Sequence, residues 1–190
     1  MSSNRLAYFV ALDLPSDVRE ELMLIGSGVP GARWIDEDQL HLTLRYLGEV
    51  DGATLRDLTS ALLRLEVEPF ELQLHGIGFF PPRGEPEVLW VGANQSPPLH
   101  HLRARVDQLA TRFGVTPDRR RYTPHVTLAR LREAPASRLA RFAMEHALWK
   151  SRVFQAESFS LYSSRRRPEG ALYERQAVVL IRAQEPARPE

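Results

Sequence analysis

Two short segments of the sequence repeat one chemical pattern. Residues 41–44 read His-Leu-Thr-Leu, and residues 125–128 read His-Val-Thr-Leu. The chain holds six histidines, too few for two such matches to be expected by chance. Side chains alternate between the two faces of a β-strand, so the histidine and the threonine share a face and the apolar residues share the other. Each segment therefore predicts a strand that anchors in a core and presents an imidazole beside a hydroxyl.

The elements predicted around these segments run twice in a similar order. Apolar runs and alternation predict strands over 6–12, 40–47, 70–80, 88–91, 126–131, 153–162 and 172–181. Helical spacing predicts helices over 16–26, 51–65, 97–113 and 136–148, with Ser16 as an N-cap. Such an internal duplication predicts two similar α+β lobes that face each other across a cleft. No G-x-G-x-x-G or P-loop pattern occurs, which disfavours a dinucleotide or Walker site.

Composition limits the kinds of partner and site. The formal net charge of the 190 residues is +1, so a broad positive field for non-specific nucleic-acid binding is excluded. All the basic residues except Lys150 are arginines, and two triplets, 119–121 and 165–167, could guide RNA or simply face water. The absence of cysteine excludes disulfides, thiolate nucleophiles and zinc ribbons. No apolar run approaches a membrane span and no signal peptide is indicated, so we expect a cytoplasmic protein.

The paired histidines predict acid–base chemistry on a phosphate. If the lobes face each other, two imidazoles and two hydroxyls converge on one space. A neutral histidine would then accept a proton from water, while a protonated one would donate a proton to the leaving oxygen. The threonine hydroxyls would stabilise the phosphoryl oxygens. Two histidines alone are a poor zinc set, so no metal is expected, and no G-x-S-x-G elbow supports a serine hydrolase.

The residues that flank the two segments strengthen a resemblance to a known family. Residues 45–48 read Arg-Tyr-Leu-Gly after the first segment, and Ala129-Arg130 follows the second. With the opening strand 5–11, Trp34 and the Tyr-Thr-Pro of 122–124, the chain resembles the 2H phosphoesterase superfamily. Within it, the chain is most similar to the LigT-like RNA 2′,3′-cyclic phosphodiesterases, once called 2′-5′ RNA ligases.

The resemblance implies a fold, a reaction and residue roles. The fold would be bilobal α+β, with two pseudo-symmetric antiparallel-sheet lobes and outer helices around a central cleft. Residues 1–183 would form a single domain, with 184–190 as a disordered tail. The reaction would hydrolyse a terminal 2′,3′-cyclic phosphate to a 2′-phosphomonoester without metal or cofactor. His41 would be the proton donor, His125 the proton acceptor, and Thr43 and Thr127 would hold the phosphoryl oxygens. The symmetry of the two segments does not by itself assign acid and base.

Further substrate-binding candidates lie near the two segments. Strict alternation places Arg45 on the face of His41 and Thr43 and places Arg130 off the face of His125, unless a strand end or bulge redirects it. The family pattern favours Arg130 as a phosphate neighbour. Four aromatic residues could stack a terminal base or belong to the core: Tyr8, Phe9, Trp34 and Tyr122.

The expected partners are RNA with a 2′,3′-cyclic phosphate end or cyclic nucleotides. We expect no membrane association, no obligate protein partner and a monomeric enzyme. A minor, reversible 2′-5′ RNA ligation would use the same histidines. The alternatives are a phosphodiesterase for 2′,5′-oligonucleotides or small cyclic nucleotides, or a catalytically weak module that binds RNA or nucleotides. The intact His-Thr pairs argue against a pure binder, which needs no imidazole in a defined protonation state.

Overall fold

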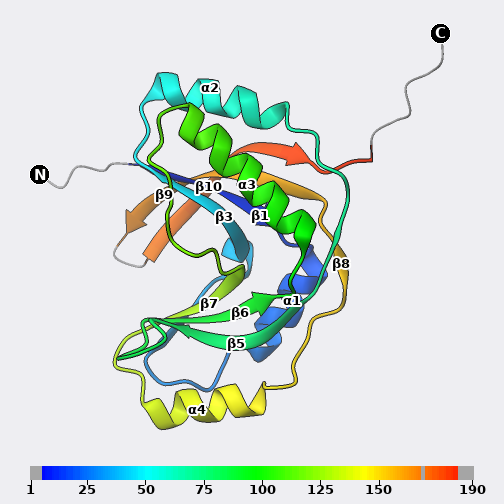
Figure 1. The fold of residues 1–190 in the computed structure, drawn as a ribbon. Helices are drawn as coiled ribbons and strands as arrows, with labels where there is room; N and C mark the ends of the chain where they lie inside the picture. The colour runs from blue at the N-terminus through cyan, green and yellow to red at the C-terminus, as the bar shows by residue number, and fades with distance from the viewer. Residues whose placement is uncertain (1–5, 168–169, 184–190) are drawn as a thin grey trace, which may run out of the picture.

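The computed structural model describes residues 6–167 and 170–183 (Figure 1). Arg5 and the predicted tail 184–190 lie outside the described residues. In chain order the elements are β1 (Ala7–Asp13), α1 (Ser16–Ile25), β2 (Ala32–Trp34), the 3₁₀ turn η1 (Glu37–Gln39), β3 (His41–Gly48), α2 (Gly52–Leu63), β4 (Glu71–Leu72), β5 (Leu74–Phe80), β6 (Val88–Ala93), α3 (Pro97–Arg112), β7 (His125–Leu131), α4 (Ala136–Glu145), β8 (Phe154–Gln155), β9 (Ser158–Arg167) and β10 (Gly170–Leu180).

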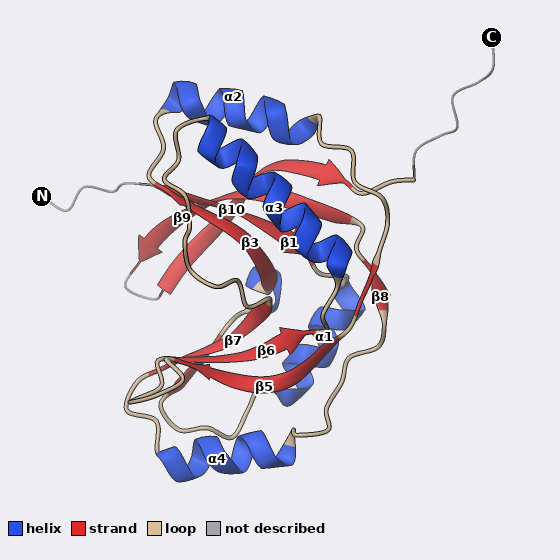
Figure 2. Ribbon diagram, viewed as in Figure 1, coloured by secondary structure: helices blue, strands red, loops and turns tan. Residues whose placement is uncertain are grey.

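One curved antiparallel sheet runs through the molecule in the order β10-β9-β1-β3-β7-β6-β5, and β2 adds a further pairing to β7. We call β1, β3, β9 and β10 the β3 lobe, and β2, β5, β6 and β7 the β7 lobe. The two lobes join where Leu42 of β3 pairs with Val126 of β7. Figure 2 shows the strands of the two lobes facing each other, with the helices on the outside. The predicted α+β fold with outer helices is therefore confirmed, and the lobes share one sheet.

Local sequence accounts for most of the helix boundaries. The Asp51 carboxylate accepts hydrogen bonds from the backbone N–H groups of Ala53 and Thr54 and so caps α2. Ser96 caps α3 in the same way, and prolines occupy its first turn, where no intrahelical donor is needed. The prediction that Ser16 is an N-cap is wrong, because Ser16 is already helical and Pro15 stands at the cap position. Proline at that place fixes the backbone angle without a side-chain hydrogen bond.

The helices bury apolar faces against the outer side of the sheet and leave the inner side to the cleft. A single cluster of buried residues includes members of both lobes, among them Val10 and Leu102 of one half and Leu89 and Phe142 of the other. Helix α3 follows β6 of the β7 lobe but packs on β3 of the other lobe and against α2. The two halves are thus interlocked by chain connections as well as by the shared sheet. Among the described residues, none of the helices combines the length and apolarity that a membrane crossing requires.

Candidate active site

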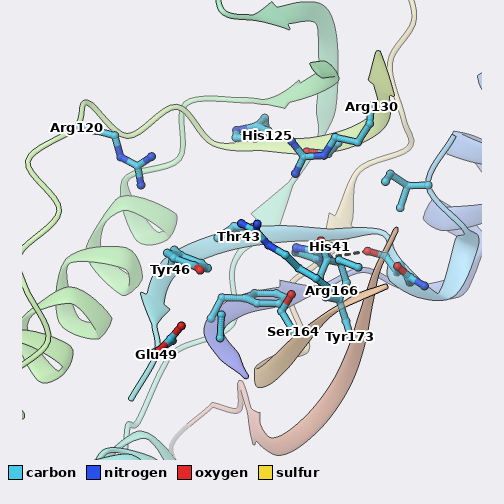
Figure 3. A pocket seen from close by; sticks show the side chains of 16 residues that line it. His41, Thr43, Tyr46, Glu49, Arg120, His125, Arg130, Ser164, Arg166 and Tyr173 are labelled. Carbon is cyan, nitrogen blue, oxygen red and sulfur yellow. Dashed lines mark hydrogen bonds between the residues drawn. The ribbon is translucent and has the colours of Figure 1, made fainter. Parts of the chain in front are cut away.

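The two repeated segments meet at the centre of the sheet and line one cleft. His41 begins β3 and His125 begins β7, and the strands cross-pair one residue later. Side chains of both histidines and of Thr43 and Thr127 line a cleft of about 1120 Å³ between the lobes. Figure 3 shows His41 and Thr43 on one side of this space and His125 on the other. The predicted convergence of two imidazoles and two hydroxyls is confirmed.

Each motif strand carries a β-bulge at the same place. In β3 the pairing with β1 passes from Thr43 to Arg45 without a partner for Leu44. In β7 the pairing with β6 passes from Thr127 to Ala129 without a partner for Leu128. A bulge inserts one extra residue and turns the following side chains to the opposite face. The cleft face of each strand therefore carries the histidine, the threonine and then the residue five positions after the histidine, which is Tyr46 in one lobe and Arg130 in the other.

The bulge overturns the alternation prediction for Arg45. Its side chain is 5% exposed and lies on the core side of β3, where Nε is 2.6 Å from a carboxylate oxygen of Asp107. Asp118 lies 3.8 Å away, and the guanidinium also donates to the carbonyl oxygens of Tyr46 and Thr116. Arg45 thus ties β3 to α3 and to the loop after it. Arg130, which alternation placed off the cleft, lines it beside both histidines (Figure 3).

Both imidazoles are anchored through the same ring nitrogen. His41 Nδ1 lies 2.7 Å from the carbonyl oxygen of Gln39, and His125 Nδ1 lies 2.7 Å from that of Thr123. A carbonyl oxygen only accepts hydrogen bonds, so Nδ1 is the donor in each pair. The neutral ring therefore has an unprotonated Nε2, which can act as a base, and the charged ring has an Nε2–H, which can act as an acid.

Aromatic rings hold each imidazole in place. The His41 ring lies 4.8 Å from Phe9 and 5.2 Å from Tyr173, with Tyr162 at 6.0 Å. The His125 ring lies 5.0 Å from Phe80 and 5.8 Å from Trp90. Packing of this kind fixes ring orientation and removes water from the imidazole, which disfavours its charged form.

The burial of both histidines lowers their pKa values. Burial is the largest effect on His41 and brings its pKa to about 4, against the hydrogen bond to Gln39 and the negative charge of Asp13, which both raise it. The positive charges of His125 and Arg130 lower it further. Burial likewise lowers the pKa of His125, with the Thr123 hydrogen bond raising it and Arg130 lowering it. The charge of His125 is thus one of the effects on the pKa of His41, so protonation of one ring disfavours protonation of the other.

Arginines surround the cleft on three sides. Arg130 comes from β7, Arg166 from β9 and Arg120 from the loop before β7 (Figure 3). The Arg120 guanidinium is held by Asp118 at 2.9 and 3.0 Å, and this hydrogen bonding brings the pKa of Asp118 to about 2. Each predicted triplet thus contributes its middle residue to the cleft. The arrangement suits an anion, because fixed guanidinium groups bind phosphate oxygens in a planar, bidentate manner.

The four aromatic candidates have different surroundings. Phe9 lines the cleft but is 4% exposed and packs on His41. Tyr122 lies at the edge of a neighbouring hollow; its hydroxyl donates to the Thr43 carbonyl oxygen at 3.1 Å, and burial raises its pKa. Tyr8 and Trp34 lie outside the cleft lining and pack against the core, with Trp34 5.7 Å from Phe142. Tyr8 and Trp34 therefore agree with the core alternative rather than with a place in the cleft lining.

Some cleft residues were not predicted from the sequence. Tyr46 reaches the cleft only because of the bulge, and Tyr173 and Ser164 come from the C-terminal hairpin, which carries no motif. The remaining unpredicted lining residues are Ala7, Ile35, Gln39, Glu49 and Ala171. Within residues 6–167 and 170–183, no three histidine, aspartate or glutamate side chains gather in a way that could hold a metal ion.

Comparison with known proteins agrees with this architecture. The family model of the 2′-5′ RNA ligase superfamily matches residues 28–168. A Thermus thermophilus protein named RNA 2′,3′-cyclic phosphodiesterase is 36% identical over 178 residues, which cover 87% of this chain and 85% of that protein. A protein of the same name from Geobacillus stearothermophilus is 32% identical over 132 residues, 66% of this chain. The match spans 42% of the Geobacillus protein and 61% of an Aeropyrum pernix relative of that name.

Among solved structures, E. coli LigT complexed with 3′-AMP superposes with a TM-score of 0.72 at 25% identity, covering 92% of this chain and 97% of that one. The likeness therefore extends over both lobes and the cleft between them. Because the family model spans both His-x-Thr segments and the Thermus relative aligns over most of both chains, the protein belongs to the 2′-5′ RNA ligase superfamily.

Proposed function

We propose that this protein is an RNA 2′,3′-cyclic phosphodiesterase, which hydrolyses the cyclic phosphate at an RNA 3′ end to a 2′-phosphomonoester. The observation that carries the proposal is the pair of histidines that face one cleft with Nδ1 anchored on a carbonyl oxygen in each. Each ring offers Nε2 to the cleft, one to take a proton and one to give it. The name shared by the relatives adds independent support.

The proposed reaction is a displacement at phosphorus. His125 Nε2 accepts a proton from water as the water oxygen bonds to phosphorus. The bond from phosphorus to the 3′ oxygen breaks, and His41 Nε2–H donates its proton to that oxygen. The phosphate stays on the 2′ oxygen. One proton of water goes to His125, the hydroxyl of water stays on phosphorus, and the 3′ oxygen takes its proton from His41; proton exchange with solvent then returns both histidines to their starting states. This assignment of donor and acceptor follows the family, because the anchoring of the two rings is the same.

The remaining cleft side chains bind the phosphate in this proposal. The Thr43 and Thr127 hydroxyls donate to the non-bridging oxygens, and Arg130 offsets the negative charge that develops there. Tyr46 occupies in the β3 lobe the position that Arg130 has in the β7 lobe, so the motif strand itself supplies a guanidinium only in the β7 lobe.

The proposed substrate is the end of an RNA strand rather than a free cyclic nucleotide. A second hollow of about 450 Å³ adjoins the cleft and shares with it Thr43, Tyr46, Arg120, His125, Thr127 and Arg130. Its lining also includes Arg103, Arg121 and Tyr122, residue types that suit a neighbouring phosphate and base. In 2′-5′ ligation, which we propose as a minor activity, the 5′-hydroxyl of a second RNA would replace water. An RNA substrate and a chain without cysteine are both consistent with the cytoplasm, which we propose as its location.

The test is hydrolysis of a short RNA ending in 2′,3′-cyclic phosphate, with chelator present and with the product monophosphate identified. We expect a 2′-phosphate. His41→Ala and His125→Ala should each lower kcat by about 10²–10⁴-fold, the usual contribution of a general acid or base. His101→Ala, an exposed histidine on α3, is the matched control and should keep wild-type rates.

Several results would contradict the proposal. A 3′-phosphate product would mean that the other bond breaks, and near wild-type rates in either cleft variant would remove the two-histidine mechanism. A loss of activity with chelator that added metal restores would show metal dependence. Faster turnover of a cyclic mononucleotide or a 2′,5′-linked oligonucleotide would change the substrate class. Tight RNA binding without turnover would indicate a binding module.

A further inference from the structure

Asp13 lies beside His41, on the neighbouring strand β1, and we describe a residue in this partner position as standing behind the histidine. It is the last residue of β1, and in the antiparallel register it is the partner of His41 at the start of β3. Partners in an antiparallel pair project to the same face with their Cβ atoms about 5 Å apart. The Asp13 side chain is 12% exposed, so its carboxylate is largely shielded from water. A negative charge in this position acts on the imidazole through little solvent.

Four donors converge on this carboxylate. Hydroxyl groups of β9 donate to it from Ser158 at 2.6 Å, Ser160 at 2.7 Å and Tyr162 at 2.5 Å. The Arg175 guanidinium of β10 lies 3.3 Å from Oδ1 and also contacts the Tyr162 hydroxyl at 3.3 Å. An ionised carboxylate only accepts hydrogen bonds, so a set made entirely of donors fits the charged form. The Tyr162 ring stacks near His41, which connects this cluster to the imidazole.

The β7 lobe has no such group. The strand partner of His125 is Gly92, which stands where Asp13 stands in the β3 lobe. The bulges, the backbone anchors and the threonines are repeated in both lobes, whereas this position differs. The two histidines are therefore anchored alike but lie in different electrostatic surroundings.

Different charged groups surround the two histidine rings. His41 meets Asp13 of β1 and, across the cleft, His125 and Arg130 of β7; of these only Asp13 raises its pKa. His125 meets Arg130, which lowers its pKa. Further out, Arg166 of β9, Arg120 and Glu49 line the same cleft, and Arg175 of β10 lies behind Asp13. Asp13 is thus the carboxylate that raises the pKa of His41, and no carboxylate is among the effects on the pKa of His125.

We propose that Asp13 is a positioning residue that selects His41 as the proton donor, by holding a negative charge behind its imidazole while glycine stands behind His125. This inference rests on the proposed function. Burial lowers the pKa of His41, which opposes a donor role, and Asp13 counters that effect together with the phosphate charge of a bound substrate. His125 has no carboxylate behind it and has Arg130 nearby, and in this proposal it is the acceptor.

The test is Asp13→Asn, which removes the charge and keeps the size. We expect the pKa of His41, followed by NMR of its ring, to fall in the variant while that of His125 moves less. The limb of the kcat profile that coincides with the His41 titration should move to lower pH. At neutral pH kcat should fall about tenfold for each unit by which the His41 pKa falls, with KM little changed. Asp13→Glu should restore part of the loss.

The control is Asp57→Asn, which removes an exposed carboxylate on α2 and should change neither the titrations nor the profile. Circular dichroism and urea unfolding of Asp13→Asn establish that the cluster still folds. An unchanged His41 titration and an unchanged profile would overturn the inference, and an equal shift of both histidines would remove the selection. If wild-type protein fails to hydrolyse the cyclic phosphate, the proposed function fails, whereas the NMR titration still decides whether Asp13 acts on His41.

Discussion

At the scale of single residues, Nδ1 of each cleft histidine bonds to the carbonyl oxygen two residues earlier. The contact is short-range in the chain, because donor and acceptor are only two residues apart. The sequence shows the histidines but not this contact, which depends on the backbone path before β3 and β7. Nε2 is therefore the reactive nitrogen in both rings.

The lowered pKa of His41 makes stability depend on pH. In the unfolded chain this histidine has its ordinary pKa of 6.5, and in the folded protein burial brings it to about 4. Between these values the unfolded chain binds a proton that the folded form does not, so folding loses stability as the pH falls from about 6.5 to 4. His125 is shifted in the same direction.

We expect the free energy of unfolding in urea to be lower at pH 4.5 than at pH 7.5, with about 1–3 kcal/mol of the difference due to His41. His41→Asn should show a smaller difference between the two pH values than the wild type. An equal difference in both proteins would mean that the folded histidine titrates like an unfolded one.

Arg45 illustrates a limit of pattern reasoning at this scale. Arg45 is the fifth residue of a strand that begins with a cleft histidine, and from this position the sequence pattern predicts a phosphate ligand. Its ion pair with Asp107 belongs to α3, far away in the sequence, and a buried arginine must have such a partner. The partner is visible only after folding.

At the scale of secondary-structure elements, the paired bulges decide which side chains reach the cleft. A strict period of two places Arg45 inside and Arg130 outside, and one extra residue in each strand reverses both. Neither bulge is marked by glycine or proline; Leu44 and Leu128 are buried leucines that read as ordinary strand residues. Most strands and helices were predictable, because apolar periodicity and capping residues act locally. The pattern missed β2, and the predicted strands 70–80 and 153–162 each divide between the large sheet and the small β4-β8 sheet.

A glycine in β5 makes room for the ring that packs beside His125. A Cβ atom at Gly78 would lie 2.0 Å from Cζ2 and 2.2 Å from Cη2 of Trp90. We expect Gly78→Ala to push the indole toward His125, to destabilise the protein by about 1–3 kcal/mol and to lower kcat. Urea unfolding and turnover of the cyclic-phosphate RNA measure the two effects.

The matched control is Gly52→Ala at the start of α2. A Cβ atom there would meet nothing closer than the Arg56 guanidinium at 3.6 Å, an ordinary contact with a flexible side chain. Stability should remain within about 0.5 kcal/mol of the wild type or rise slightly. If Gly78→Ala behaves like this control, the indole is free to move away and does not position the histidine.

At the scale of the whole molecule, the lobes share one sheet and one apolar cluster, and α3 crosses from one lobe to the other. We propose on these grounds that residues 1–183 form a single domain. The cleft and the adjoining hollow are both built from parts of the two lobes, so the path that we propose for an RNA strand requires both lobes.

The variant Arg121→Ala tests the proposed path for the RNA strand. It lines the adjoining hollow, is exposed and forms no ion pair with the described residues, whereas Arg120 is already paired with Asp118. We expect Arg121→Ala to lower kcat/KM for an RNA of several nucleotides by about 3–10-fold, more than for a 2′,3′-cyclic mononucleotide, and to weaken the salt dependence.

Arg138→Ala, an exposed arginine on α4 outside both hollows, is the control for the loss of one positive charge. If Arg121→Ala lowers kcat/KM equally for the RNA and for the cyclic mononucleotide, Arg121 acts on the reacting nucleotide and not on the rest of the RNA strand. If Arg121→Ala and Arg138→Ala change kcat/KM for the RNA equally, the effect comes from the lost positive charge in general and the proposed path for the RNA strand is wrong.

The sequence by itself determined the repeated elements, the two His-x-Thr segments and their common chemistry, because propensity, capping and alternation are set by neighbours along the chain. Only the tertiary structure decided that Arg130 rather than Arg45 reaches the cleft and that Tyr46 joins it. It also decided that a hydroxyl-bound Asp13 stands behind one histidine and a glycine behind the other. These features depend on strand register and on partners far away in sequence, which a local pattern does not contain.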